Sequence, residues 1–177
     1  MRRAPIKFAD IPQDFINALL AAEDDNFANH HGVDFKSLMR AGSELIKSGH
    51  IQTGGSTITM QVAKNFFLSS ERSFSRKINE ILLALQIERE LSKDEILELY
   101  VNKIYLGNRA YGIEAAAQVY YGKSIRDTSL AQMAMIAGLP KAPSRFNPLA
   151  NAPRSKERRD WILGRMYKLG RIDQERY

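Results

Sequence analysis

The chain has 177 residues, with 26 lysines and arginines against 20 aspartates and glutamates, which gives a formal net charge of +6. This length suits one domain with its own hydrophobic core, and a content of 44% hydrophobic and 26% charged residues is ordinary for a globular protein. The absence of cysteine excludes a disulfide scaffold, a thiolate metal site and a cysteine nucleophile. The positive charge favours an anionic partner, which can be nucleic acid, membrane head groups or a phosphorylated substrate.

The hydrophobic pattern is helical along most of the chain. In chain order we expect helices from Pro12 to 23–27, and over 34–48, 56–67, 75–91, 92–104, 115–121, 130–137 and 154–169. Ser92 with Glu95 and Ser129 with Gln132 form capping boxes at two of these starts. No apolar run approaches the roughly 20 residues that span a bilayer. The sequence therefore predicts a single, mainly α domain over 1–177.

The first group of chemical interest begins where the first helix ends. Glu23 and Asp24 follow an apolar helix face, and Phe27, His30 and His31 come soon after. A carboxylate at the end of a buried helix can serve as a general base or acid. The alternative is that these acids are solvated loop residues or a helix cap. A metal site from the two histidines is disfavoured because adjacent histidines usually point apart.

The second group is a glycine pair at 54–55 followed by Ser56 and Thr57 at a helix start. Such a start exposes backbone N–H groups and favours an anion. Gln61 and Lys64 lie on the same helix face as Thr57, so this face offers a hydroxyl, an amide and a cation to a phosphate. The alternative is an ordinary N-cap with a solvated lysine.

In the third group, Arg76 and Lys77 precede Glu80. One interpretation is that the two cations bind a charged group while the acid faces a cleft. The other is a surface pair between Arg76 and Glu80, which contributes only about 0.3–0.5 kcal/mol.

Two further groups are more structural in character. Over 93–102 the apolar residues favour a core helix, and Glu98 and Asn102 share a face from which we expect them to brace a site. Residues 141–144 lie in a proline-rich segment, where we expect a turn first and a substrate contact second.

Taken together, the five groups resemble the motifs of the peptidoglycan glycosyltransferase domain of family 51, found in class A penicillin-binding proteins and monofunctional transglycosylases. Glu-Asp-x-x-Phe-x-x-His-x-Gly begins at Glu23, Gly-x-Ser-Thr-Ile-x-x-Gln-x-x-Lys-Asn at Gly54, and Arg-Lys-x-x-Glu at Arg76. Lys-x-x-Ile-Leu-Glu-x-Tyr-Leu-Asn begins at Lys93 with Val101 in place of leucine. The Arg-Ala-Pro-Ser block has a lysine at its first position, 141. The groups follow the family's order, so the resemblance covers nearly the whole chain.

The resemblance implies a lysozyme-like, mainly α fold with a large head lobe and a small membrane-facing jaw lobe, in which 34–51 is a mobile, basic and amphipathic segment. It implies an inverting enzyme that polymerises lipid II into β-1,4-linked glycan strands and releases undecaprenyl pyrophosphate. By resemblance, Glu23 is the base and Glu80 the second catalytic acid. The residues implied in substrate binding are Asp24, Phe27, His30, Ser56, Thr57, Gln61, Lys64, Asn65, Arg76 and Lys77. No cofactor is firmly implied; a divalent cation, Mg or Mn, near Glu80 is an expectation.

The same resemblance implies lipid II, the growing lipid-linked glycan, the membrane surface and other cell-wall synthesis proteins as partners, and no nucleic acid. We expect the outer, periplasmic face of the bacterial cytoplasmic membrane as the location, with an anchor before this domain and a transpeptidase domain after it. The cations Lys36, Arg40, Lys47 and those of 154–159 are expected to meet anionic head groups. The competing hypotheses are a lysozyme-type hydrolase that uses Glu23, and a basic helical module that binds nucleic acid or membrane.

Overall fold

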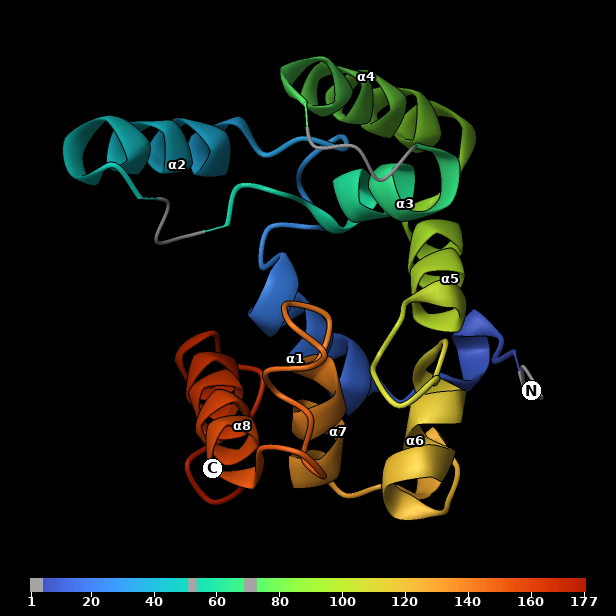
Figure 1. Ribbon diagram of the computed structural model, residues 1–177. Coiled ribbons are helices and arrows are strands. Elements are labelled where there is room, and N and C mark those ends of the chain that lie inside the picture. Colours follow the sequence, from blue (N-terminus) through green and yellow to red (C-terminus); the bar gives the residue numbers. More distant parts are fainter. Residues whose placement is uncertain (1–4, 51–53, 69–72) are drawn as a thin grey trace. The chain divides into compact units, whose positions relative to one another are not determined.

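The computed structural model describes residues 5–50, 54–68 and 73–177. Over these ranges the chain is mainly helical (Figure 1), with one isolated antiparallel bridge between Tyr105 and Tyr111. The α-helices are α1 (Gln13–Glu23), α2 (Phe35–Ser48), α3 (Ile58–Phe67), α4 (Phe74–Glu90), α5 (Lys93–Lys103), α6 (Ile113–Tyr121), α7 (Leu130–Ala137) and α8 (Ala152–Lys168). Two short 3-10 helices, η1 (Phe8–Asp10) and η2 (Ile125–Asp127), complete the description.

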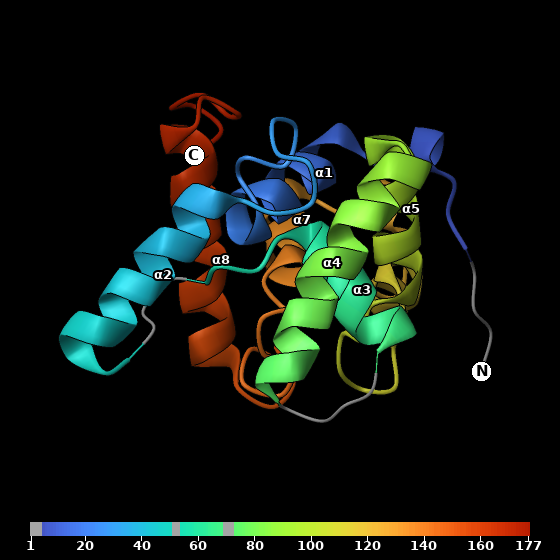
Figure 2. The same cartoon turned by 90° about the horizontal axis from the view of Figure 1, so that it is seen from above.

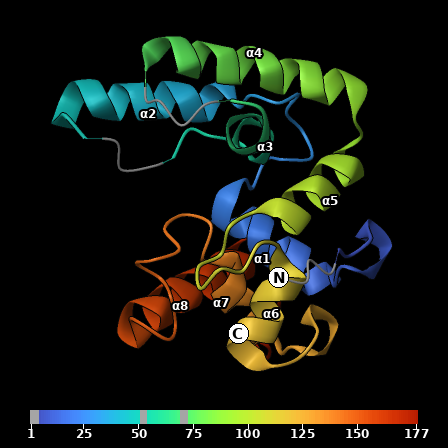
Figure 3. The same cartoon turned by 45° about the vertical axis from the view of Figure 1, so that its right-hand side comes forward.

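The chain clusters into two compact units, and unit 1 consists of 1–25 and 98–177. Within it α1, α7 and α8 pack against one another, and α6 packs against α7 and η2 (Figure 3). Phe15, Leu19, Ile136 and Ile162 are among its fully buried side chains. Because α1 lies in this core, its C-terminal residue Glu23 is held by well-packed helices.

Unit 2 consists of 26–97 and contains α2, α3, α4 and the first part of α5. Here α3 and α4 lie side by side, as Figures 1 and 2 both show, while α2 extends away from them. A small apolar cluster of Val33, Met60 and Ala84 joins the loop before α2 to these helices. Leu38, Ile81 and Leu85 pack against this cluster.

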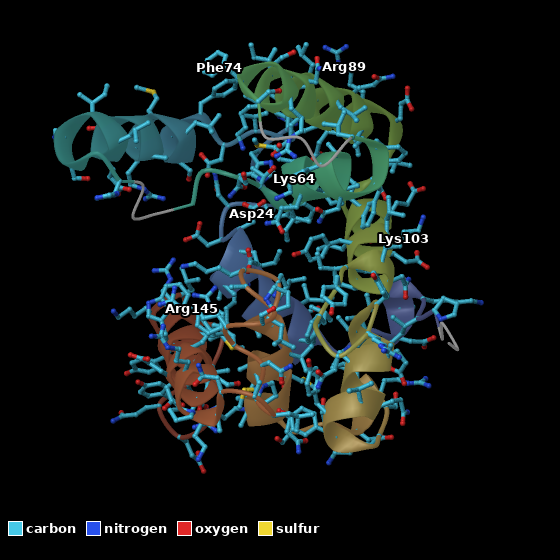
Figure 4. All side chains as sticks on the ribbon, viewed as in Figure 1. Asp24, Lys64, Phe74, Arg89, Lys103 and Arg145 are labelled. Atoms are coloured by element: carbon cyan, nitrogen blue, oxygen red, sulfur yellow. The ribbon has the colours of Figure 1, made fainter. Side chains whose placement is uncertain are left out.

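Ile78, Ile81, Leu82 and Leu85 predict an apolar stripe on α4, and the structure buries it only in part, since Ile81 and Leu85 pack against the cluster of unit 2. Glu80, Ala84 and Ile87 are buried, whereas Ile78 and Leu82 are about half exposed. Phe74 precedes them at four-residue spacing, and Figure 4 shows it on the outer side of α4. The helix is therefore rotated toward Glu80, because the carboxylate has partners inside unit 2.

Local signals predict most helix boundaries correctly. The capping box of Ser129 and Gln132 forms at the start of α7, and Ser92 and Glu95 exchange hydrogen bonds of 3.1 and 3.2 Å before α5. Helix α8 begins two residues earlier than expected, because Asn151 accepts a hydrogen bond from the backbone of Arg154 and a proline occupies its first turn. No helix within the described ranges is long and apolar enough to cross a membrane.

Candidate active site

Glu23 is the last residue of α1, and its side chain is only 10% exposed. Within unit 1 its Oε1 lies 3.8 Å from Nη2 of Arg158, and the ring of Tyr100 is buried nearby. Burial raises the pKa of the Tyr100 hydroxyl well above its ordinary value, and the charge of Glu23 raises it further. Tyr100 therefore stays protonated at any working pH, and Arg158 is a cation 3.8 Å from the carboxylate of Glu23.

The acids that follow Glu23 differ in their surroundings. Asp24 is buried directly after α1, at the place that Figure 4 marks. Asp25 is half exposed and pairs with Arg165 of α8 at 2.5 Å. The interpretation of these acids as uniformly solvated loop residues is therefore wrong for Glu23 and Asp24.

Arg158 corrects the prediction that the cations of 154–159 all meet membrane head groups. It is 9% exposed, and its guanidinium lies 4.6 Å from the ring centre of Trp161 and 5.7 Å from that of Phe146. Burial lowers the pKa of Arg158, while the charge of Glu23 acts in the opposite direction. The signal in the sequence was the spacing of Ser155, Arg158 and Ile162, which places the arginine on the buried face of α8.

In unit 2, Lys77 joins the second and third sequence groups. Its Nζ donates to Ser56 Oγ at 3.0 Å and to Glu80 Oε1 at 3.2 Å. Glu80 is 2% exposed, whereas the side chain of Lys77 is 43% exposed. The ammonium of Lys77 therefore contacts a buried carboxylate and remains partly open to an approaching anion. The interpretation of Glu80 as the surface partner of Arg76 is wrong, because Glu80 is buried.

Further polar groups lie on α3 and in the first turn of α4, both within unit 2. Lys64, labelled in Figure 4, is partly exposed and makes no hydrogen bond or ion pair to another described residue. Gln61 is partly buried one turn before it, and Asn65 is exposed. Arg76 is partly buried in the first turn of α4, where its backbone N–H donates to the capping Ser73. These side chains keep a cation and amides at the surface of unit 2.

Thr57 is the N-cap of α3 and also ties α3 to the first group. Its Oγ accepts from the backbone N–H of Met60 at 3.0 Å and donates to the carbonyl of Gly32 at 2.6 Å. The Thr57 hydroxyl has one hydrogen, and it donates that hydrogen to the Gly32 carbonyl. Thr57 can therefore donate to a substrate only if its hydrogen bond to Gly32 breaks. The alternative interpretation of Thr57 as an ordinary helix N-cap is therefore confirmed.

Phe27 and His30 are buried in the same loop. His30 Nδ1 accepts a hydrogen bond from the backbone N–H of Gly32 at 3.0 Å. The rings of Phe27 and His30 pack edge to face, with their centres 5.7 Å apart. Lys93 Nζ lies 4.3 Å from the centre of the Phe27 ring and donates to the His30 carbonyl at 2.7 Å. These contacts position the loop that carries Gly32; direct substrate contact by Phe27 and His30 stays a prediction.

Glu88 is a residue that sequence reasoning missed. Its Oε1 accepts from Thr59 Oγ1 at 2.8 Å and from Lys93 Nζ at 2.7 Å, so it links α3, α4 and α5 within unit 2. It is nearly buried, at 7% exposure. Its position near the end of an amphipathic helix resembles that of a solvated acid, and only the partners on distant segments distinguish the two.

Asn102, which was expected to brace a site together with Glu98, holds the N-terminal segment in the structure. Its side chain accepts from the backbone N–H of Ile6 and donates to the Ile6 carbonyl, both at 2.8 Å. It therefore fixes the N-terminal segment of unit 1. Residues 141–144 lie in the expected turn.

Gly32 has a backbone conformation that other residues rarely adopt. Its φ is +105°, and a Cβ there would lie 2.7 Å from the carbonyl oxygen of Ala84. We expect Gly32→Ala to lower the free energy of unfolding by about 2 kcal/mol or more, measured by urea denaturation. Gly42→Ala is the matched control: a Cβ at Gly42 meets nothing within 4 Å, and alanine there should be neutral or stabilising. Equal stability of the two variants would contradict this role of Gly32.

The divalent cation near Glu80 stays a prediction. No group of three or more histidine, aspartate or glutamate side chains suited to a metal ion occurs among the described residues. The carboxylate of Glu80, near which a divalent cation was expected, is engaged by Lys77.

Known proteins similar to this chain match it over nearly its whole length. The family model described as transglycosylase matches residues 1–167. The chain is 84% identical to penicillin-binding protein 1A of Pseudomonas aeruginosa over 100% of its length, and 54% identical to that of Escherichia coli over 99%, but it covers only 22% and 21% of those proteins.

A crystal structure of penicillin-binding protein 1A from Haemophilus influenzae matches with a TM-score of 0.59 and 36% identity. This match covers 100% of the present chain and 17% of the other. The chain spans about a fifth of the length of the curated relatives that it matches. It belongs to the transglycosylase family, the peptidoglycan glycosyltransferases of cell-wall synthesis that class A penicillin-binding proteins carry.

Proposed function

We propose that this chain polymerises lipid II into β-1,4-linked glycan strands and releases undecaprenyl pyrophosphate. The observation that carries the proposal is the position of Lys77, whose Nζ is 3.0 Å from Ser56 Oγ and 3.2 Å from Glu80 Oε1. A half-exposed ammonium that is oriented by a buried carboxylate suits a pyrophosphate leaving group.

On the acceptor side, Glu23 is the general base. Its carboxylate accepts the proton of the 4-hydroxyl on the incoming lipid II as that oxygen attacks the anomeric carbon of the growing strand. The new C–O bond forms as the bond to pyrophosphate breaks, and the electron pair of the broken bond leaves with the pyrophosphate. Attack opposite the leaving group converts the α-linked donor into a β-linkage, so the reaction inverts.

On the leaving-group side, catalysis needs positive charge. Lys77, Arg76 and Lys64 neutralise the pyrophosphate, with Gln61 and Ser56 as hydrogen-bonding groups. A departing pyrophosphate is stable as an anion and needs no protonating acid. Glu80 therefore serves by holding Lys77, because its carboxylate accepts a hydrogen bond from that ammonium.

The substrate carries a lipid tail, and α2 is suited to meet its membrane. Phe35, Met39 and Ile46 are 65%, 74% and 87% exposed, an unusual degree for large apolar side chains. Lys36, Arg40 and Lys47 are on the same helix and are exposed or partly exposed. A helix with exposed apolar residues and cations binds anionic lipid surfaces. We propose that unit 2 faces the outer surface of the cytoplasmic membrane in this way; the part of the predicted 34–51 segment at Ile51 lies outside the described residues.

The membrane role of α2 gives a direct prediction. The double variant Met39→Ser with Ile46→Ser should reduce the fraction of protein that sediments with anionic lipid vesicles several-fold, because two exposed apolar contacts are lost. Leu149→Ser with Val119→Ser is the control, since both residues are exposed apolar side chains of unit 1. Equal loss in both variants would show that sedimentation reports general surface hydrophobicity and not α2.

The enzymatic proposal is tested by incubating the chain with fluorescent lipid II and resolving the products on a gel. We expect a ladder of glycan strands that a muramidase digests. The competing hydrolase hypothesis predicts no strands, and instead soluble fragments from purified cell-wall sacculi.

A further inference from the structure

We propose that Arg158 is a positioning residue that keeps Glu23 ionised, so that Glu23 is ready to accept the proton of the acceptor hydroxyl. This inference rests on the proposed function of Glu23 as the base. Arg158 lies outside all five sequence motifs, and its contacts are all within unit 1.

The geometry of the pair favours an electrostatic role. Arg158 Nη2 and Glu23 Oε1 are 3.8 Å apart, which is an ion pair but too long for a hydrogen bond. Both side chains are about 90% buried, at 9% and 10% exposure, and charges at this distance interact much more strongly there than in water. The guanidinium therefore stabilises the negative charge of Glu23 without taking up the carboxylate in a hydrogen bond of its own.

The surroundings of Arg158 show that it is held for its charge. It makes no hydrogen bond to any residue that the structure describes, and Nε is buried without a partner among them. Its guanidinium instead lies over Trp161 and Phe146. Its stem passes Gly138, where a Cβ would come within 2.8 Å of Arg158 Cγ. Burying an arginine is costly, and the negative charge of Glu23, 3.8 Å away, compensates this cost.

Several groups packed near Glu23 in unit 1 do not carry a positive charge. Helix α7, which packs on α1, contains no titratable residue. Tyr100 on α5 stays neutral because burial holds its pKa well above the ordinary value. Of the acids that follow in sequence, Asp25 already pairs with Arg165, and Asp24 can only add negative charge. Removing Arg158 therefore increases the proton affinity of Glu23.

Loss of Arg158 should move the pH dependence of activity to higher pH. The base works only when deprotonated, so activity falls as pH drops and Glu23 takes up a proton. Without Arg158, protonation occurs at higher pH. The acidic limb of the rate-against-pH profile should then move upward by about one pH unit or more in Arg158→Gln. Arg158→Lys keeps a charge and should move it less.

The experiment measures this profile for polymerisation of lipid II by the wild type, Arg158→Gln and Arg158→Lys. A second readout is independent of turnover: the ¹³C signal of the Glu23 side-chain carboxyl, assigned by its loss in Glu23→Gln, is titrated in each protein. We expect both midpoints to rise in Arg158→Gln and to recover partly in Arg158→Lys. Far-UV circular dichroism checks that each variant folds.

If Arg158→Gln does not fold, Gly138→Ala tests the same idea, because its methyl group displaces the Arg158 stem. A uniform loss of rate at every pH with an unchanged carboxyl midpoint would overturn the inference and leave Arg158 a packing residue. A wild-type chain that makes no glycan strands would instead overturn the proposed function. The carboxyl titration still decides the Arg158–Glu23 coupling in that case.

Discussion

Replacing Glu23 by glutamine is expected to lower the rate of glycan polymerisation by about 10³-fold or more without unfolding the chain. The amide has nearly the same shape as the carboxylate but cannot accept the proton of the acceptor hydroxyl, and general-base catalysis contributes about 10²–10⁴-fold. Glu23 ends α1 in the packed core of unit 1, so the fold around it is set by other side chains. Strand formation from lipid II and the thermal melting temperature should be measured together.

The control for this variant is Asp25→Asn. It makes the same carboxylate-to-amide change two residues away, at a half-exposed residue that pairs with Arg165. We expect Asp25→Asn to polymerise at close to the wild-type rate. If Glu23→Gln retained near wild-type activity, the assignment of the base would be wrong.

The second large effect is expected at Lys77. Lys77→Ala should reduce polymerisation by about 10²-fold, the usual cost of losing one group that stabilises a developing charge. It should also weaken binding of an inhibitor that carries a pyrophosphate-like group, because such a group would bind the same ammonium. The physical reason is that Lys77 is the ammonium that Glu80 and Ser56 orient. Steady-state rates and inhibitor titration are the measurements.

Loss of Lys77 also leaves Glu80 buried without its ion-pair partner, so stability must be separated from activity. The double variant Lys77→Met with Glu80→Gln removes both charges and should melt at a higher temperature than Lys77→Ala. It should remain as inactive, because the cation is still missing. Lys156→Ala removes an exposed cation of α8 and is the charge control. Recovery of activity in the double variant would show that Lys77 matters only for folding.

Helix positions are predictable here because their signals are local. Ser129 with Gln132 and Ser92 with Glu95 mark helix starts within four residues of sequence. The rotation of α4 is not local. The apolar stripe of Ile78, Ile81, Leu82 and Leu85 predicts one buried face, yet Ile78 and Leu82 are about half exposed and Glu80 is buried. The pairing with Lys77 offsets the desolvation of the carboxylate, and hydrophobic periodicity does not contain that information.

In the candidate site too, local motifs are predictable from the sequence whereas contacts between distant residues are not. A motif match names Thr57, Phe27 and His30 without saying what they touch, and the structure gives all three close contacts inside unit 2. Sequence reasoning missed Glu88 because it resembles a solvated acid, and the spacing that places Arg158 on the buried face of α8 does not identify its distant partner. Their roles depend on contacts with Glu23 and with Thr59, far away in sequence.

The proposed polymerisation, with Glu23 as the base, is tested by counting two products in one reaction. Wild-type chain and Glu23→Gln are each incubated with lipid II, and undecaprenyl pyrophosphate and new β-1,4 linkages are quantified over time. We expect one pyrophosphate released for each β-linkage formed by the wild type, and neither product above background with Glu23→Gln. Pyrophosphate release without new linkages, or equal amounts of both products from the two proteins, would contradict it.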